Sequence, residues 1–164
     1  FFDGFTRDVY AYDTQTDQWT HCDDALANGR AGAVACSNGK RYFAGTGYNT
    51  SSMNDWWEFN PDSAMWIQRS SIPNGGRMFA SAIAVNERIF LLGGRRFGGT
   101  LTTGFLFDDL LEYDVAADKW LLRGRFPQGG RENMISFSIK GQGYFGLGED
   151  INGKICNDFY TWHD

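Results

Sequence analysis

Three arginines recur at one place in a repeated pattern, and they are the side chains here best suited to bind an anion. Arg30, Arg77 and Arg131 each follow a glycine. A further glycine stands seventeen residues after each of them, at Gly47, Gly94 and Gly148. Because a guanidinium group binds a carboxylate through two parallel hydrogen bonds, a ring of such arginines could hold carboxylates. Alternatively, they bond backbone carbonyls or acids of adjacent units and lock those units together.

The residue after each arginine varies, as Ala31, Met78 and Glu132. Since a departure from a repeat often marks the part that is used, these positions are candidates for specificity. Among these residues, Arg131 and Glu132 best resemble a catalytic pair. A glutamate can act as an acid or base if desolvation raises its pKa.

The longest departure from the repeat is the segment RRFGGTLTTGFLFDD, which separates Gly94 from Asp109 by fifteen residues. The corresponding distances are eight residues after Gly47 and ten after Gly148. Insertions in repeat proteins map to loops, often on the binding face. Arginines mixed with aromatic residues are typical of interface anchors, although these aromatics could instead fold back onto a sheet edge. The candidate contacts are Arg95, Arg96, Phe97, Phe105 and Phe107.

A second repeat predicts the elements that position these residues. The segments DVYAYDTQTDQW, DWWEFNPDSAMW and DLLEYDVAADKW begin at Asp8, Asp55 and Asp109, and DFYTWHD begins at Asp158. An aromatic residue follows each aspartate by four positions, and a tryptophan follows the first three by eleven. The arginine–glycine pattern and the aspartate–tryptophan pattern recur in the same order along the chain, which indicates true internal repeats.

Each period reads as four short strands. An apolar run after the arginine leads through a tight turn (NGK, NER or KGQ) into a glycine-ended strand such as IFLLGG. The aspartate-led strand follows, and a polar turn returns it to the tryptophan strand. Four strands in roughly 50 residues is the signature of a propeller blade, whose two faces are both covered. Trp56 and Trp57, on opposite faces of one strand, fit that arrangement.

With these repeats, the chain resembles the kelch-repeat family, in the superfamily of the galactose-oxidase central domain. The matching motifs are LLGG at positions 91–94 and the segments PNGGR and PQGGR. GKRYFAGTGYNTSSMNDWWEFNP and GQGYFGLGEDINGKICNDFYTW are especially similar to bacterial cell-envelope kelch proteins. The resemblance implies an all-β kelch β-propeller, an incomplete arc of about three to four four-stranded blades. The segments would be 5–22, 30–69, 77–123 and 131–164.

An open arc would leave apolar faces bare, because each repeat buries its core only against its neighbours. The remaining blades would come from the same longer chain or from other copies. The resemblance also implies a secreted, periplasmic or outer-membrane-associated protein. The chain opens on FFDGF, without an initiator methionine, so we expect a trimmed product that has lost its targeting segment.

Composition excludes several classes of function. A net charge of −5 and a pI near 4.9 argue against a nucleic-acid partner. No apolar run approaches the roughly 20 residues that span a bilayer. The three cysteines lack metal-type spacing and are expected to be small buried thiols.

Three weaker motifs are also present. EDINGK, with Glu149 and Asp150, offers oxygen ligands for calcium, but it lacks a full spaced ligand set and favours a polar hairpin turn. Asn49 begins a glycosylation acceptor pattern. The copper-radical chemistry of galactose-oxidase-like propellers needs a cluster of histidines, tyrosines and cysteine. His21 and His163, the only histidines, do not supply it.

The resulting expectation is a non-catalytic scaffold for a protein partner, with no cofactor and no metal. The alternative is a carbohydrate-binding propeller or one similar to sialic-acid mutarotases, which would take a glycan.

Overall fold

The computed structural model describes residues 4–22, 26, 28–100 and 103–162. These residues form seventeen strands, joined in antiparallel sheets and hairpins, and no helix. The expectation of an all-β fold is therefore confirmed. The described part of the chain accordingly has no helix long and apolar enough to cross a membrane.

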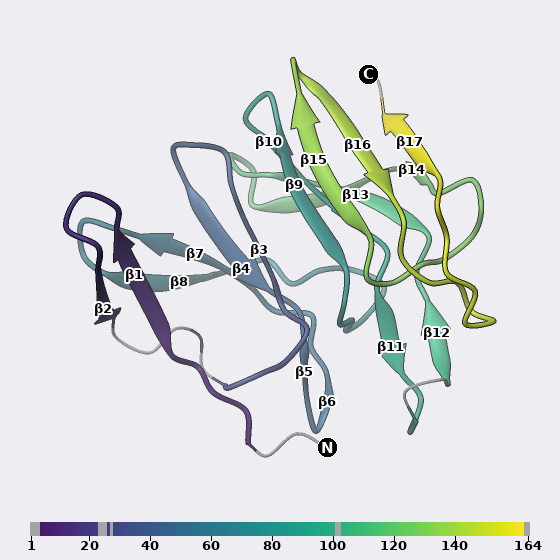
Figure 1. Ribbon diagram of the computed structural model, residues 1–164, viewed down its shortest axis with the longest axis horizontal. Coiled ribbons are helices and arrows are strands. Elements are labelled where there is room, and N and C mark those ends of the chain that lie inside the picture. Colours follow the sequence, from purple (N-terminus) through teal and green to yellow (C-terminus); the bar gives the residue numbers. More distant parts are fainter. Residues whose placement is uncertain (1–3, 23–25, 27, 101–102, 163–164) are drawn as a thin grey trace.

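The main strands group in chain order (Figure 1). The first hairpin pairs β1 (Val9–Asp13) with β2 (Gln18–Cys22). The second sheet has the order β3 (Val34–Ser37), β4 (Tyr42–Gly45), β7 (Trp56–Asn60) and β8 (Met65–Arg69). The third sheet has the order β9 (Ser81–Val85), β10 (Arg88–Leu92), β13 (Asp109–Asp114) and β14 (Lys119–Arg125). The last sheet has the order β15 (Ile135–Ile139), β16 (Gln142–Gly146) and β17 (Phe159–Trp162).

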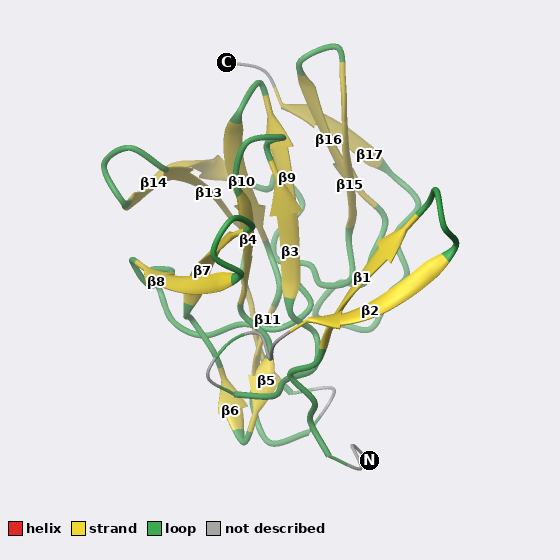
Figure 2. Cartoon of the chain, turned by 90° about the vertical axis from the view of Figure 1, so that its left-hand side faces the viewer, coloured by secondary structure: helices red, strands yellow, loops and turns green. Residues whose placement is uncertain are grey.

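Two further hairpins interrupt the second and third sheets between their second and third strands. They pair β5 (Tyr48–Asn49) with β6 (Ser51–Ser52), and β11 (Arg95–Phe97) with β12 (Gly104–Leu106). The long insertion is thus mainly a hairpin, with positions 101–102 outside the described residues. Both hairpins project from the same end of the sheets, at the bottom of Figures 1 and 2, which we call the hairpin end.

The recurring glycines permit the bend at which each hairpin or turn leaves its sheet. Gly47, Gly94 and Gly148 all have positive φ, at 101°, 95° and 81°. A Cβ atom on any of them would lie within 3.0 Å of a backbone carbonyl oxygen of the neighbouring segment. Glycine is required here both for the backbone conformation and for the close approach of two backbones.

The first strands of successive sheets lie side by side, because β9 contacts both β3 and β15 (Figure 2). Apolar side chains fill the space between the sheets. One cluster joins the second and third sheets, with Trp56 and Tyr113 among its members. Another joins the third and last sheets, through Phe90 and Phe145. The third sheet therefore buries one face against the second sheet and the other against the last sheet.

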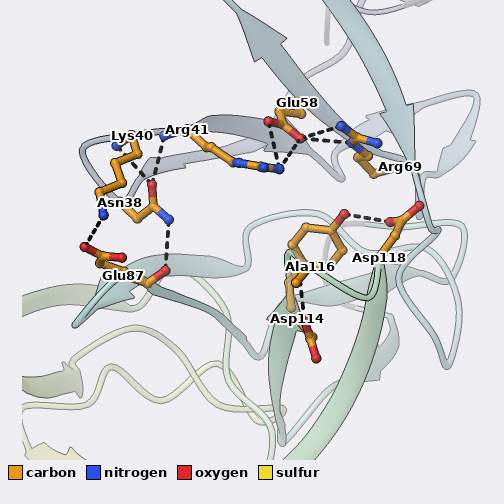
Figure 3. A network of polar contacts seen from close by, with 10 residues as sticks. Asn38, Lys40, Arg41, Glu58, Arg69, Glu87, Asp114, Ala116 and Asp118 are labelled. Carbon is orange, nitrogen blue, oxygen red and sulfur yellow. Dashed lines mark hydrogen bonds and ion pairs between the residues drawn. The ribbon is translucent and has the colours of Figure 1, made fainter.

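Polar contacts reinforce these junctions at the turn end, opposite the hairpins (Figure 3). Asn38 donates its side-chain amide to the Glu87 carbonyl at 2.9 Å, and Lys40 Nζ lies 2.6 Å from the Glu87 carboxylate. Asn86 repeats the first contact by donating to the Gly141 carbonyl at 3.3 Å. The tight turns of successive sheets are therefore linked.

Candidate functional site: the hairpin end

Each repeated arginine forms a two-pronged ion pair with the aspartate at the start of the third strand of its own repeat. The pairs are Arg30 with Asp55 (2.6 and 2.7 Å), Arg77 with Asp109 (2.6 and 3.0 Å) and Arg131 with Asp158 (2.5 and 2.9 Å). The guanidinium groups that could have received a ligand carboxylate are already occupied by carboxylates of this chain. Their partners belong to the same sheet and not to an adjacent one.

Burial strengthens this structural interpretation. The Arg77 side chain is completely buried, lies 3.7 Å from the centre of the Phe107 ring and also donates to the Gly93 carbonyl at 3.1 Å. Arg131 Nη1 likewise donates a hydrogen bond to the Leu147 carbonyl, at 3.4 Å. Each arginine therefore ties the end of the second strand to the start of the third.

The residues after the arginines contribute their backbones to the base of the hairpin end. Ala31, Met78 and Glu132 form antiparallel bridges with Tyr48, Arg95 and Glu149. Met78 and Glu132 are buried, and Ala31 is half-buried. The side chains that vary at these positions therefore mainly contact neighbouring residues of the protein and not solvent.

Arg95 and Glu132, both candidate binding residues, form a buried ion pair with each other. The Arg95 Nε and Nη2 atoms lie 2.8 and 2.6 Å from Oε1 of Glu132, and Arg95 also donates to the Thr103 carbonyl. This pair anchors the β11–β12 hairpin to the start of the last sheet. The sequence placed these residues in different candidate sets, and the fold brings them together.

The rest of the insertion divides into a buried and an exposed part. Phe107 is 3% exposed, so it folds back onto the sheet, whereas Phe105 is 56% exposed and rests edge-to-face on it at 5.0 Å. Arg96 is exposed and donates to the Asn74 carbonyl at 2.5 Å. Phe97 is half-buried against Tyr48, at 4.8 Å. Arg96 and Phe105 are thus the accessible members of the predicted set.

Two surface hollows meet at Arg96. The first is lined by Asn74, Arg96, Phe105, Phe107, Asp108, Asp109 and Arg125. The second is lined by Tyr48, Thr50, Ser51, Ser52, Arg96 and Phe97. Sequence reasoning missed Tyr48, although it occupies the same position after its glycine as Arg95 does after Gly94. That shared position was the signal that could have identified it.

The EDINGK segment forms a turn closed by its own hydrogen bonds, as expected. Asp150 accepts the Asn152 and Lys154 amides at 2.8 and 3.0 Å, and these bonds lower the pKa of its carboxyl group. Among the described residues, no group of three or more histidine, cysteine or acidic side chains could hold a metal ion. His163 lies outside the described residues.

The amide of Asn49 is engaged, because its nitrogen donates to the Gly29 carbonyl at 2.6 Å. The three cysteines are free thiols and only half-buried, so the expectation of buried thiols holds only in part. Burial raises the pKa of Cys36 to about 12, which keeps that thiol protonated and unreactive at neutral pH.

No protein-family model matches this sequence, and no curated protein matches it. Solved structures with the same fold do exist. One is the structure of YjhT, which superposes with a TM-score of 0.79 at 18% sequence identity over 94% of this chain. The chain spans 48% of the YjhT chain. At this identity the likeness concerns the fold alone.

Proposed function

We propose that the chain is part of a kelch-type β-propeller, with its sheets as successive blades, and acts as a non-catalytic scaffold at a bacterial cell envelope. The hairpin end would bind a protein partner. The observation that carries the proposal is the contrast within the candidate residues. Those suited to catalysis are buried and paired, whereas Phe105 and Arg96 are presented on a firmly anchored hairpin.

The pairing bears directly on catalysis. Glu132 would need access to a substrate to act as a general acid or base. Instead its carboxylate is buried against Arg95, and Arg131 is taken up by Asp158. Both groups stabilise the start of the last sheet, so we assign them a structural role.

The hairpin itself has the properties of a contact surface. A large exposed aromatic ring beside an exposed guanidinium is the combination enriched at interface hot spots. The β11–β12 hairpin is held by the Arg95–Glu132 pair and by the bond from the Phe97 amide to the Ser52 hydroxyl at 2.9 Å. A partner would therefore meet a preorganised surface, which lowers the entropic cost of binding.

A photo-crosslinking phenylalanine analogue at position 105 tests this proposal. Leu122 is the matched control, because it is also 56% exposed but lies on β14. We expect one envelope protein to be captured from position 105 and not from position 122. The purified partner should then bind about tenfold more weakly or worse to Phe105→Ala and Arg96→Ala. Identical capture from both positions, or unchanged binding by both variants, would contradict the proposal.

A carbohydrate-binding or mutarotase-like role is the second candidate. It is favoured by the hollow between the two hairpins, where the Tyr48 and Phe97 rings lie beside Ser51, Ser52 and Arg96. Such a mixture of apolar surface and convergent polar groups suits a small polar ligand. Saturable binding of a glycan that is lost in Arg96→Ala and Tyr48→Ala would support it. No binding across a glycan panel that includes sialic acid would count against it.

A further inference from the structure

One face of the last sheet carries apolar side chains that no described residue covers. Ile135, Phe137 and Ile139 alternate along β15 and are 51, 39 and 50% exposed. The strand register places Tyr144 and Phe159 on the same face, and their rings lie 5.1 and 5.7 Å from the Phe137 ring. We call these five residues the open face. A contiguous apolar surface of this kind marks an interaction site.

The third sheet shows what covers such a face. Ile83 and Val85 stand six and eight residues after their repeated arginine, as Phe137 and Ile139 do, but they are only 6 and 2% exposed. The last sheet buries them with its other face, which presents Phe145, Tyr160 and Trp162. The occupant that this surface accepts elsewhere in the chain is therefore another sheet of the same repeat.

A backbone link repeats at each covered junction. The Gly47 amide donates to the Arg77 carbonyl of the next sheet at 2.8 Å, and the Gly94 amide donates to the Arg131 carbonyl at the same distance. Gly148 is the next member of this series, and within the described residues its amide forms no such link. The Gly148 amide, beside the open face, is thus a hydrogen-bond donor. Its expected acceptor is the carbonyl of a following sheet at the position equivalent to Arg77 and Arg131.

A second copy of this chain would cover the open face poorly. The first hairpin of that copy would present the exposed Tyr12 and Trp19. In the repeat, its two strands correspond to the third and fourth strands of the other sheets. At the covered junction, the aromatic rings of the preceding sheet that the corresponding Tyr113 contacts are Phe43 and Trp56, on its second and third strands. The first-strand row of the open face would stay exposed.

We propose that in the native protein a further complete sheet of the same repeat, carried by the same polypeptide, covers the open face. Its first strand would lie on Ile135, Phe137 and Ile139, and the carbonyl at its arginine position would accept the Gly148 amide. YjhT, of which this chain spans 48%, is long enough to carry additional sheets of this size. This inference concerns assembly and does not depend on what the hairpin end binds.

The intact mass of the protein from its native source is the first test. The expected result is a polypeptide well above 18.5 kDa. A native polypeptide of 18.5 kDa would overturn the proposal. So would a discrete oligomer of the 164-residue chain that Phe137→Glu dissociates, because the open face would then belong to a second copy.

Phe137→Glu provides the second test when it is placed in both the native protein and the 164-residue chain. Burying a carboxylate against an apolar sheet is costly, so the unfolding equilibrium constant of the native protein should rise roughly a hundredfold. The 164-residue chain should change little, since the side chain is exposed there. Ile155→Glu, at a position 74% exposed, is the control in both. An equal response to Phe137→Glu in the two proteins would refute the proposal.

Discussion

The third and last sheets contain the same ion pair in two environments. Arg77 and Asp109 have side chains that are 0 and 4% exposed, between a sheet on either side. Arg131 and Asp158 keep the same two-pronged geometry, but the Asp158 side chain is 38% exposed. The repeat thus fixes which groups pair, whereas the neighbouring segments decide how far the pair is removed from water. The energetic weight of one motif should therefore differ between its two copies.

Removing the arginine should expose that difference most strongly. Arg77→Ala leaves the buried Asp109 carboxylate without its partner and should lower the free energy of unfolding by about 3–5 kcal/mol. Arg131→Ala should cost about 1.5–3 kcal/mol, because Asp158 can be hydrated. Urea denaturation of both variants measures the losses, with the exposed Arg96→Ala as the control. Equal losses in the two sheets would show that burial does not set the strength of the pair.

Apolar truncation compares the covered and open faces of the same two sheets. Ile83→Ala creates a cavity between the third and last sheets and should cost about 2–4 kcal/mol. Phe137→Ala, at the equivalent position, should cost less than about 1 kcal/mol in the 164-residue chain, because the side chain is 39% exposed and its removal leaves no enclosed cavity. Thermal unfolding of the two variants provides the measurement. A larger loss for Phe137→Ala would mean that the open face is covered in this chain.

The smallest expected effect is on the pH dependence of stability. The Arg131 guanidinium holds the pKa of Asp158 below its ordinary value of 3.8. The folded pKa is depressed, so the stabilisation is complete above pH 3.8 and is lost as the pH falls toward the folded value. Asp158→Asn should therefore be less stable than the parent chain near neutral pH, and the difference should shrink in acid. Melting temperatures measured from neutral pH down to about pH 2 test this, and a constant difference would contradict it.

In the sequence, the arginine and the aspartate of each ion pair belong to two separate repeating patterns. The arginines and the strand-initial aspartates each recur, but 25 residues separate Arg30 from Asp55 and 32 separate Arg77 from Asp109. Because this distance varies with the hairpin between them, the spacing alone did not show that the two series meet. The alternative that the arginines lock adjacent units came closest, although the acids that they bind belong to their own sheet.

The insertion shows a similar division. Its length of fifteen residues predicted a loop that departs from the repeat, and the sequence left open whether the aromatic residues would project or fold back. Both occur, because Phe107 packs under the Arg77 guanidinium while Phe105, on β12, is 56% exposed. Residues two positions apart on a strand share a face, so alternation does not separate these two rings. Phe107 lies past the end of β12, where the chain returns to the third sheet, whereas Phe105 lies within the exposed hairpin.

By itself, the sequence determined the all-β class and the strand order within each period, because the alternation of apolar residues, the turns and the glycines are local signals. Only the tertiary structure decided which charged groups are paired and which apolar rows remain open. Those outcomes depend on contacts between segments far apart in the chain, as between Arg95 and Glu132. A repeat specifies the same side chains in each sheet, but the presence of a neighbouring sheet decides whether they form core or surface.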